Sequence, residues 1–144
     1  MDLLFVVDVS SYMTGTNLIK YKTFMTNFVQ TLHIHPNYVR VAFIAYDGLG
    51  SSWMTYFNQG QTLNNVLWSI NRLQLRGGGE PSLLYVLQNL NTLVYQQSRG
   101  SRLDTPKVVL LLTGGKARKD QAPAIIREVS RLIRWMYFPS PHRF

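Results

Sequence analysis

Apolar runs alternate along the chain with segments of helical periodicity. Residues 3–7 form a continuous apolar run, which is typical of a strand buried on both faces. Residues 39–47 alternate in hydrophobicity and predict a second strand, and residues 53–57 predict a short returning strand. The apolar run at 107–112 repeats the pattern of the first strand. The hydrophobic pattern therefore predicts four strands.

Four helices are predicted between and after these strands, because apolar residues recur on one stripe of each segment. Their ranges are 18–32, 62–74, 81–97 and 121–135. The resulting order, β-α-β-β-α-α-β-α, predicts the α/β class. We expect a Rossmann-like, doubly wound and mainly parallel sheet with helices on both faces and residues 53–57 as an antiparallel edge strand.

Three polar loops follow or precede these elements at positions where a site can form. They are DVSSY at 8–12, RGGGEPS at 76–82 and TGGK at 113–116. Ligands of open α/β sheets bind beyond the carboxyl ends of the strands, so we expect the three loops to converge there. Asp8 would lie at the rim of this site, where a buried carboxylate needs a cation or hydrogen-bond donors.

Composition narrows the class of protein. A chain of 144 residues with 46% apolar and 15% charged residues is expected to fold as one globular domain. No apolar stretch approaches the roughly 20 residues of a membrane span, and no signal-peptide pattern follows Met1. The absence of cysteine excludes disulfides and thiolate metal sites.

The formal net charge of +8 is concentrated near the carboxyl end. Such a basic region can attract a polyanion, or it can be an ordinary solvated surface. Six of its side chains could bind a sulfated glycan or another polyanion, whereas nucleic acid is not expected as a partner. They are Lys116, Arg118, Lys119, Arg127, Arg131 and Arg134.

Four stretches carry a resemblance to a known family: DLLFVVDVSS, VRVAFIAY, INRLQLRGGG and PKVVLLLTGGK. In this order they resemble the von Willebrand factor type A domain of matrilins, collagens and integrins. The resemblance covers residues 1–134, and residues 135–144 are interpreted as a divergent tail in place of the family's last strands. It implies a doubly wound fold, a non-catalytic adhesion role, and an extracellular or secreted location as part of a larger protein.

The family's metal-ion-dependent adhesion site is degenerate in this sequence. Asp8 and Ser10 stand where its first aspartate and serine belong, but Tyr12 replaces the second serine. Glu80 stands in place of its threonine, and Gly114 in place of its late aspartate. Two interpretations follow: Asp8, Ser10 and Glu80 hold Mg2+ or Mn2+, or loop amides and hydroxyls satisfy Asp8 without an ion. We expect the second, with no cofactor.

The resemblance also implies that a protein partner, such as collagen or another matrix protein, contacts these loops. The candidate contact residues are Ser11, Tyr12, Met13, Gly78, Gly114 and Lys116. Binding of a sulfated glycan by the basic region is the alternative.

Other chemistries find little support in the sequence. Neither glycine loop has the spacing of a nucleotide-binding motif, and no G-x-S-x-G nucleophile motif is present. His33 and His35 form an H-x-H pair, but no third ligand lies near them in the sequence, so we expect surface histidines. We therefore do not expect an enzyme.

Overall fold

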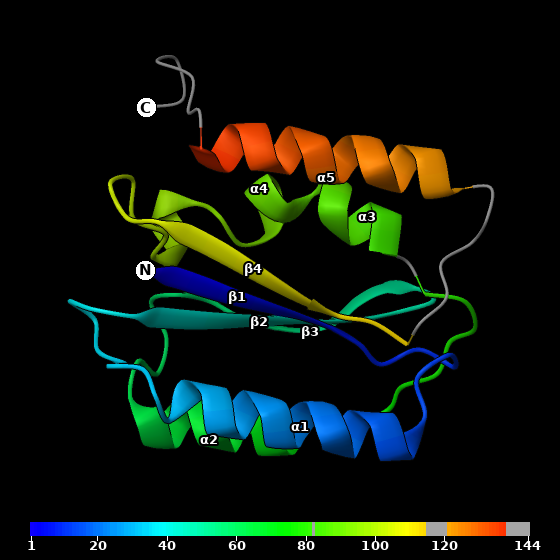
Figure 1. The fold of residues 1–144 in the computed structure, drawn as a ribbon, viewed down its shortest axis with the longest axis horizontal. Helices are drawn as coiled ribbons and strands as arrows, with labels where there is room; N and C mark the ends of the chain where they lie inside the picture. The colour runs from blue at the N-terminus through cyan, green and yellow to red at the C-terminus, as the bar shows by residue number, and fades with distance from the viewer. Residues whose placement is uncertain (82, 115–120, 138–144) are drawn as a thin grey trace.

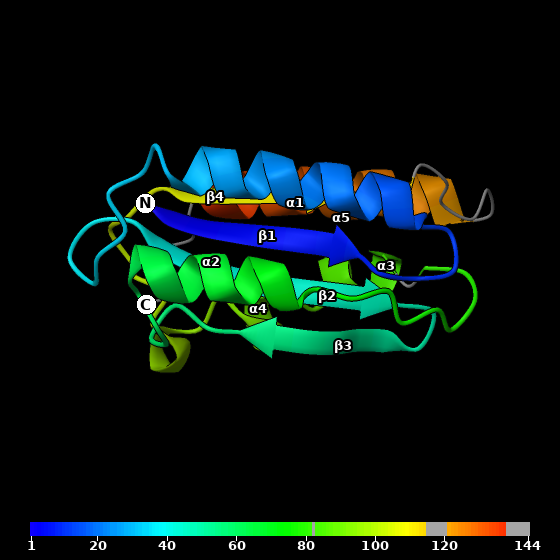
Figure 2. The same ribbon diagram turned by 90° about the horizontal axis from the view of Figure 1, so that it is seen from below.

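The computed structural model describes residues 1–81, 83–114 and 121–137. Four strands form one sheet in the order β3-β2-β1-β4 (Figures 1 and 2). They are β1 (Asp2–Asp8), β2 (Arg40–Asp47), β3 (Gly50–Thr55) and β4 (Lys107–Leu112). β1 pairs in parallel with β2 and β4, whereas β3 runs antiparallel to β2. The predicted mainly parallel sheet with one antiparallel edge strand is confirmed.

Helices cover both faces of the sheet, as predicted. One face is covered by α1 (Gly15–Val29) and α2 (Leu63–Arg72), which lie together in Figure 1. The other is covered by α3 (Leu83–Gln88), α4 (Leu90–Leu93) and α5 (Ala122–Tyr137). The short 3-10 helix η1 (Gln97–Arg99) precedes β4. No described helix is long and apolar enough to cross a membrane.

The core has two halves because successive side chains of a strand point to opposite faces. On β1, Leu3, Phe5 and Val7 pack with α1 and α2, whereas Leu4 and Val6 pack with α3 and α4. All five side chains are fully buried. Each contributes roughly 1.5–3 kcal/mol of burial free energy as an upper estimate, so β1 is the centre of the fold.

The single helix predicted over residues 81–97 is wrong. In the structure, α3 ends at Gln88, and a separate helix, α4, runs from Leu90 to Leu93. Between them, the Asn89 side chain donates a 2.7 Å hydrogen bond to the Tyr85 carbonyl. Asparagine competes in this way with the regular backbone ladder, which explains the break.

Several boundaries also differ from the prediction. α1 begins at Gly15 rather than residue 18, because the Thr14 hydroxyl accepts a 3.1 Å hydrogen bond from the Asn17 amide and caps the helix. β3 lies at Gly50–Thr55, three residues earlier at its start than the expected 53–57. α5 spans Ala122–Tyr137, so it ends two residues beyond the predicted helix at 121–135.

Candidate functional site

Asp8 ends β1 at the edge of the sheet formed by the carboxyl ends of β1, β2 and β4. Its side chain is only 1% exposed. One carboxylate oxygen accepts a 2.8 Å hydrogen bond from the Ser10 amide, and the other accepts a 2.9 Å bond from the Gly114 amide. Hydrogen bonds to an ionised carboxylate are the stronger kind. Two loops that are distant in sequence therefore close on Asp8 through their backbones.

Tyr12 connects the loop after β1 to the glycine loop. Its amide donates to the Ser10 hydroxyl at 3.1 Å, and its own hydroxyl donates to the Glu80 carboxylate at 3.0 Å. Tyr12 is half-buried and Glu80 is exposed. The Tyr12 hydroxyl thus joins the loop after β1 to the Glu80 side chain of the glycine loop.

The glycine loop is fastened to the loop after β1 by backbone bonds. The Val9 carbonyl accepts hydrogen bonds from the amides of Arg76 and Gly77 at 2.8 and 3.0 Å. Ser11 donates its amide to the Gly79 carbonyl at 3.2 Å, and the Gly79 amide donates to the Ser11 hydroxyl at 3.1 Å. Three successive glycines here have φ of +71°, +77° and +87°, which residues with a side chain rarely adopt. The three glycines of RGGGE therefore allow the backbone to make a tight turn here.

We call residues 8–13, 76–80 and 113–114 together the loop cluster. Tyr21 of α1 also supports it, because its hydroxyl donates a 2.8 Å hydrogen bond to the Thr113 carbonyl. The predicted convergence of the three loops is thus seen for their described residues.

The loop cluster leaves no room for the family's late carboxylate. A Cβ atom placed on Gly114 would lie 2.7 Å from the Tyr12 carbonyl oxygen and 2.9 Å from the Asp8 carboxylate. Magnesium requires a near-octahedral set of oxygens at about 2.0–2.1 Å. The described residues contain no group of three His, Cys, Asp or Glu side chains that could hold a metal ion. The described residues of the loop cluster therefore do not fit the divalent cation of the family's site.

The predicted partner-binding residues differ in their accessibility. Ser11 and Gly78 are exposed, and Gly114 is half-buried. Met13 is only 4% exposed and belongs to the core beneath α1, so its side chain is not available to a partner. Lys116 lies outside the described residues.

The structure describes only part of the basic region near the carboxyl end. Lys116, Arg118 and Lys119 lie outside the described residues, as does the side chain of Arg134. Arg127 and Arg131 are exposed on α5, and the Arg131 guanidinium is paired with Glu128 at 2.7 Å. The described residues therefore do not form a continuous basic surface that could bind a polyanion.

The H-x-H pair has local partners. The His33 ring stacks on Tyr38 at 4.3 Å between centroids, and His35 Nδ1 accepts a 3.0 Å hydrogen bond from the Asn37 amide. No described third ligand completes a metal site with them.

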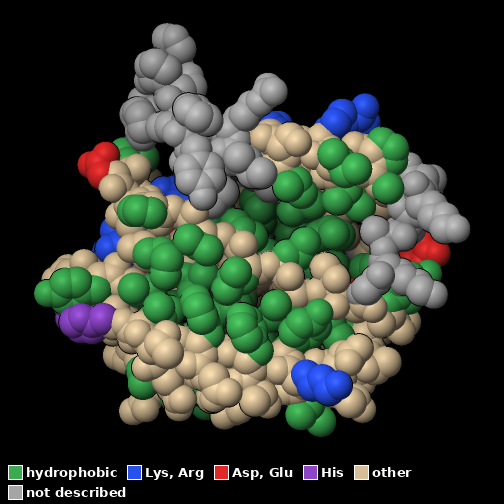
Figure 3. Space-filling model, in the orientation of Figure 1, with side chains coloured by type: hydrophobic (Ala, Val, Ile, Leu, Met, Phe, Trp, Pro, Cys, Tyr) green, Lys and Arg blue, Asp and Glu red, His purple; other side chains and the backbone are tan. Residues whose placement is uncertain are grey.

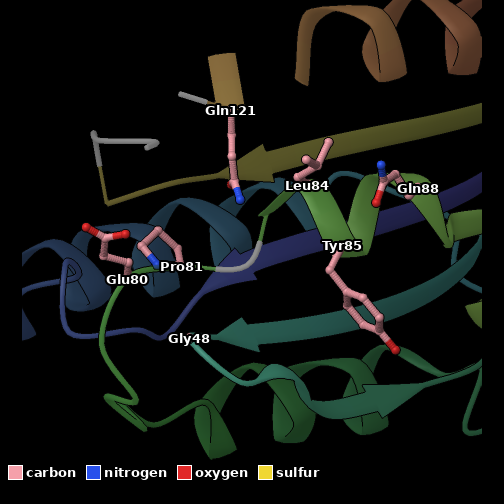
Figure 4. Close-up of a pocket in the computed structure, with 7 residues that line it drawn as sticks. All are labelled: Gly48, Glu80, Pro81, Leu84, Tyr85, Gln88 and Gln121. Atoms are coloured by element: carbon pink, nitrogen blue, oxygen red, sulfur yellow. The ribbon is translucent and has the colours of Figure 1, made fainter. Parts of the chain in front are cut away.

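A cavity of about 210 Å3 lies beside Glu80, between the turn after β2, α3 and the start of α5. Its lining includes Tyr85 and Gln121, which no sequence motif singled out. Figure 4 shows Gln121 directed toward Pro81, whereas the Glu80 carboxylate and the Tyr85 ring point away from each other. The polar groups do not converge on one point, as they would in a small-molecule site.

Together, the fold and the loop cluster define an open α/β domain whose candidate site lies beyond the carboxyl ends of its strands. The chain belongs to the von Willebrand factor type A domain family, whose model matches residues 2–136.

Similar proteins come from several sources. Rat von Willebrand factor is 26% identical over 117 residues, which cover 81% of this chain and 27% of that protein. The human collagen alpha-1(XX) chain is 32% identical over 124 residues, covering 83% of this chain and 9% of that protein. The chain thus spans about a quarter or less of the length of these relatives.

Solved structures share the fold. Proximal thread matrix protein 1 of the mussel byssus superposes with a TM-score of 0.77 at 19% identity, covering 94% of this chain and 35% of that one. Manganese-loaded TRAP protein of Plasmodium vivax gives a TM-score of 0.73 at 14% identity, covering 93% and 53%. The mussel protein has also been solved with a zinc-occupied metal-ion-dependent adhesion site.

Proposed function

We propose that this chain is a non-catalytic adhesion domain of the extracellular-matrix type that binds a protein partner through the loop cluster without a divalent cation. This proposal rests on the hydrogen bonding of Asp8, whose carboxylate is satisfied by backbone amides. Its two oxygens accept hydrogen bonds from the amides of Ser10 and Gly114, and the Tyr12 hydroxyl joins this loop to Glu80. The family's metal-dependent contact is replaced by a preassembled protein surface.

The surface suits a protein partner. Ser11, Gly78 and Glu80 are exposed around the half-buried Tyr12. Tyrosine is enriched among interface residues that contribute most binding energy, because it combines a large apolar ring with a polar tip. The hydroxyl's hydrogen bond to Glu80 holds this side chain before binding, and the amide's bond to Ser10 holds its backbone, which lowers the entropic cost of association.

Matrix relatives support the choice of partner class. The collagen alpha-1(XX) chain and the mussel thread matrix protein are both matrix components by name. We infer a matrix protein, with collagen as the first candidate, and an extracellular location for the protein that carries this domain.

The test is binding of the chain to immobilised fibrillar collagen and other matrix proteins, in Mg2+ and in EDTA. We expect equal affinity in both buffers. Tyr12→Ala should weaken binding about 10- to 30-fold, the effect of an interface anchor worth roughly 2 kcal/mol. Tyr38→Ala is the matched control, because Tyr38 is 55% exposed at the opposite end of the sheet.

Loss of binding in EDTA would refute the metal-free mechanism, and an unaffected Tyr12→Ala variant would refute the site. A steep fall in binding between low and moderate salt would favour the polyanion alternative, because counterion release governs such complexes.

A further inference from the structure

A cavity of about 280 Å3 lies between α2 and the sheet, near the edge formed by β3. Figure 2 shows α2 beside β2 and β3, and the sheet order places this edge opposite β4. The cavity is therefore separate from the hydrophobic side chains that gather between α5 and α1, over β4, in Figure 3. We call it the α2 cavity. Its lining residues, all of which the structure describes, are Val41, Phe43, Thr55, Gln59, Gly60, Asn65, Val66, Trp68 and Ser69.

The α2 cavity has an apolar floor and an aromatic side. Val41 and Phe43 of β2 and Val66 of α2 are buried, and all three belong to the core half that α1 and α2 cover. Trp68 is the largest of the lining residues that reach the surface. A ligand in the cavity would thus contact core side chains below it and an indole ring beside it.

Trp68 is held in place by Arg72, which lies one turn later on α2. The guanidinium carbon is 4.3 Å from the centroid of the indole ring, which is a cation–π contact. Arg72 is not a lining residue of the α2 cavity, so it covers a part of the indole that does not border the cavity. The ring is thus oriented before a ligand binds, which lowers the cost of ordering it.

Two polar side chains at the opening make no hydrogen bond within the described part of the chain. They are the amide of Asn65 and the hydroxyl of Ser69, four residues apart on α2. Residues at this spacing are neighbours on one face of a helix. Both groups are therefore available to a ligand.

Two further polar groups come from outside α2. The Thr55 hydroxyl accepts a 3.1 Å hydrogen bond from the Phe43 amide, and its own proton remains available for donation. The Gln59 side-chain oxygen accepts a 3.0 Å bond from the Tyr56 amide, which leaves its NH2 group to donate. The opening therefore carries donors and acceptors from four neutral side chains.

No lining residue of the α2 cavity is charged, although the chain has a formal net charge of +8. An ion in such a cavity would lose hydration without gaining a charged partner, which costs free energy. A purely apolar ring would in turn cover the polar groups at the opening without pairing them. The lining therefore fits a neutral ligand that has an apolar face and several hydroxyl or amide groups.

A sugar ring has this combination of groups. Its C–H bonds form an apolar face that can lie against an indole, and its hydroxyls project from the edge of the ring. Pockets for drug-sized ligands run from about 300 to 1,000 Å3, so a cavity of about 280 Å3 holds one small ring. We propose that the α2 cavity binds one neutral sugar ring of a glycan, with the ring face on Trp68 and the hydroxyls on Asn65 and Ser69.

The α2 cavity is distinct from the loop cluster, so this site is independent of the proposed protein-binding function. Thr55 pairs with Phe43 in the middle of β2, whereas the loop cluster lies beyond the carboxyl ends of the strands. The two sites share no residue.

The experiment is a titration of the purified chain with methyl glycosides of glucose, galactose, mannose and N-acetylglucosamine, followed by NMR of the backbone and indole N–H groups. Glucuronic acid and a sulfated glucose are the charged comparisons. We expect the signals of Trp68 and α2 to shift with at least one neutral glycoside, with a dissociation constant on the order of 1 mM for one small ring. Binding should be the same at low and moderate salt, because no charged side chain lines the cavity.

Two variants test the site. Trp68→Ala should weaken binding about tenfold or more, because it removes the aromatic side of the cavity. Tyr38→Ala is its matched control, since Tyr38 is 55% exposed against 58% for Trp68 and does not line the cavity. Asn65→Ala should weaken binding roughly three- to tenfold, the effect of one lost hydrogen bond. Its control is Asn64→Ala, which changes an exposed neighbour that does not line the cavity.

A folded chain that binds none of the four neutral glycosides would overturn the proposal, as would unchanged binding in both Trp68→Ala and Asn65→Ala. Binding of the charged sugars alone, lost at moderate salt, would also overturn it and favour the polyanion alternative. If Trp68→Ala fails to fold, Asn65→Ala decides, because the Asn65 side chain is exposed. Collagen binding should be unchanged in both variants, which separates this site from the loop cluster.

Discussion

β1 carries an aspartate at each end, and the two are satisfied in different ways. Asp2 is fully buried and Asp8 is 1% exposed. Asp2 accepts 2.9 and 2.7 Å hydrogen bonds from the Arg102 guanidinium and a 2.7 Å bond from the Arg102 amide. Asp8 accepts bonds from the backbone amides of Ser10 and Gly114.

The difference separates an end with a structural ion pair from the end at which we propose that a partner binds. Arg102 also donates to the carbonyls of Met1 and Tyr38, so the ion pair ties together three segments at the amino end of the sheet. At the other end, amides hold a carboxylate within loops that reach the surface. If a cation bound Asp8 in place of these amides, the loops would depend on that cation. Because backbone amides bind Asp8 instead, the side chains of the loops can contact a partner.

The largest effect is expected at alkaline pH, where each end of β1 loses stability through a buried tyrosine. Burial, followed by the charges of Asp8 and Tyr21, raises the pKa of Tyr46. Burial, followed by the charge of Asp2, raises the pKa of Tyr95. The fold favours both neutral phenols, so their stabilisation is complete below pH ~10, the pKa of an unfolded tyrosine, and falls as pH rises above it.

We therefore expect loss of the folded state as pH rises above ~10, which is measured by urea unfolding at successive pH values together with phenolate absorbance. Tyr46→Phe and Tyr95→Phe should each reduce the alkaline loss. A stability that is constant from pH 8 to 12 would contradict the prediction.

Asp2→Ala should destabilise the fold by about 3 kcal/mol, because it leaves the partly buried Arg102 guanidinium without its carboxylate. Urea unfolding measures the change. Arg131→Ala is the control: it removes an exposed pair with Glu128 and should cost no more than about 0.5 kcal/mol. Equal effects of the two substitutions would remove the structural role assigned to Asp2.

Asp8→Asn should cost about 2 kcal/mol, since the amide oxygen still accepts one backbone N–H while the amide nitrogen faces the other. The loss should be the same in Mg2+ and in EDTA. A larger loss than that of Asp2→Ala, or one seen only with Mg2+, would show that Asp8 interacts with more than loop amides.

The smallest effect concerns restoration of a metal site. Tyr12→Ser with Gly114→Asp should still show no rise in thermal unfolding temperature in Mg2+, because the backbone carbonyl of residue 12 and the Asp8 carboxylate still lie within 2.9 Å of the added Cβ. Gly114→Asp alone should be destabilised and indifferent to Mg2+, because its Cβ would meet the Tyr12 carbonyl. A rise for the unmodified chain in Mg2+ would show that a cation fits the present loops.

Local periodicity was sufficient to predict much of the fold. The strands at 39–47 and 107–112 and the helices on both faces follow from hydrophobic patterns, because such patterns depend on residues only a few positions apart. The break at Asn89 was missed, since a side-chain bond to Tyr85 competes with a helix that the apolar stripe favours. The burial of Met13 was also missed, because a residue in a loop gives no periodic signal.

The sequence by itself determined that Asp8 would stand at the end of a buried strand and that three loops would converge at that end of the sheet. The tertiary structure alone decided what satisfies that carboxylate and its counterpart at Asp2. Asp8 meets the amide of a residue 106 positions away, and Asp2 meets a guanidinium 100 positions away. Backbone amides are present at every position, so their role at a site depends on the path of the chain and not on residue type.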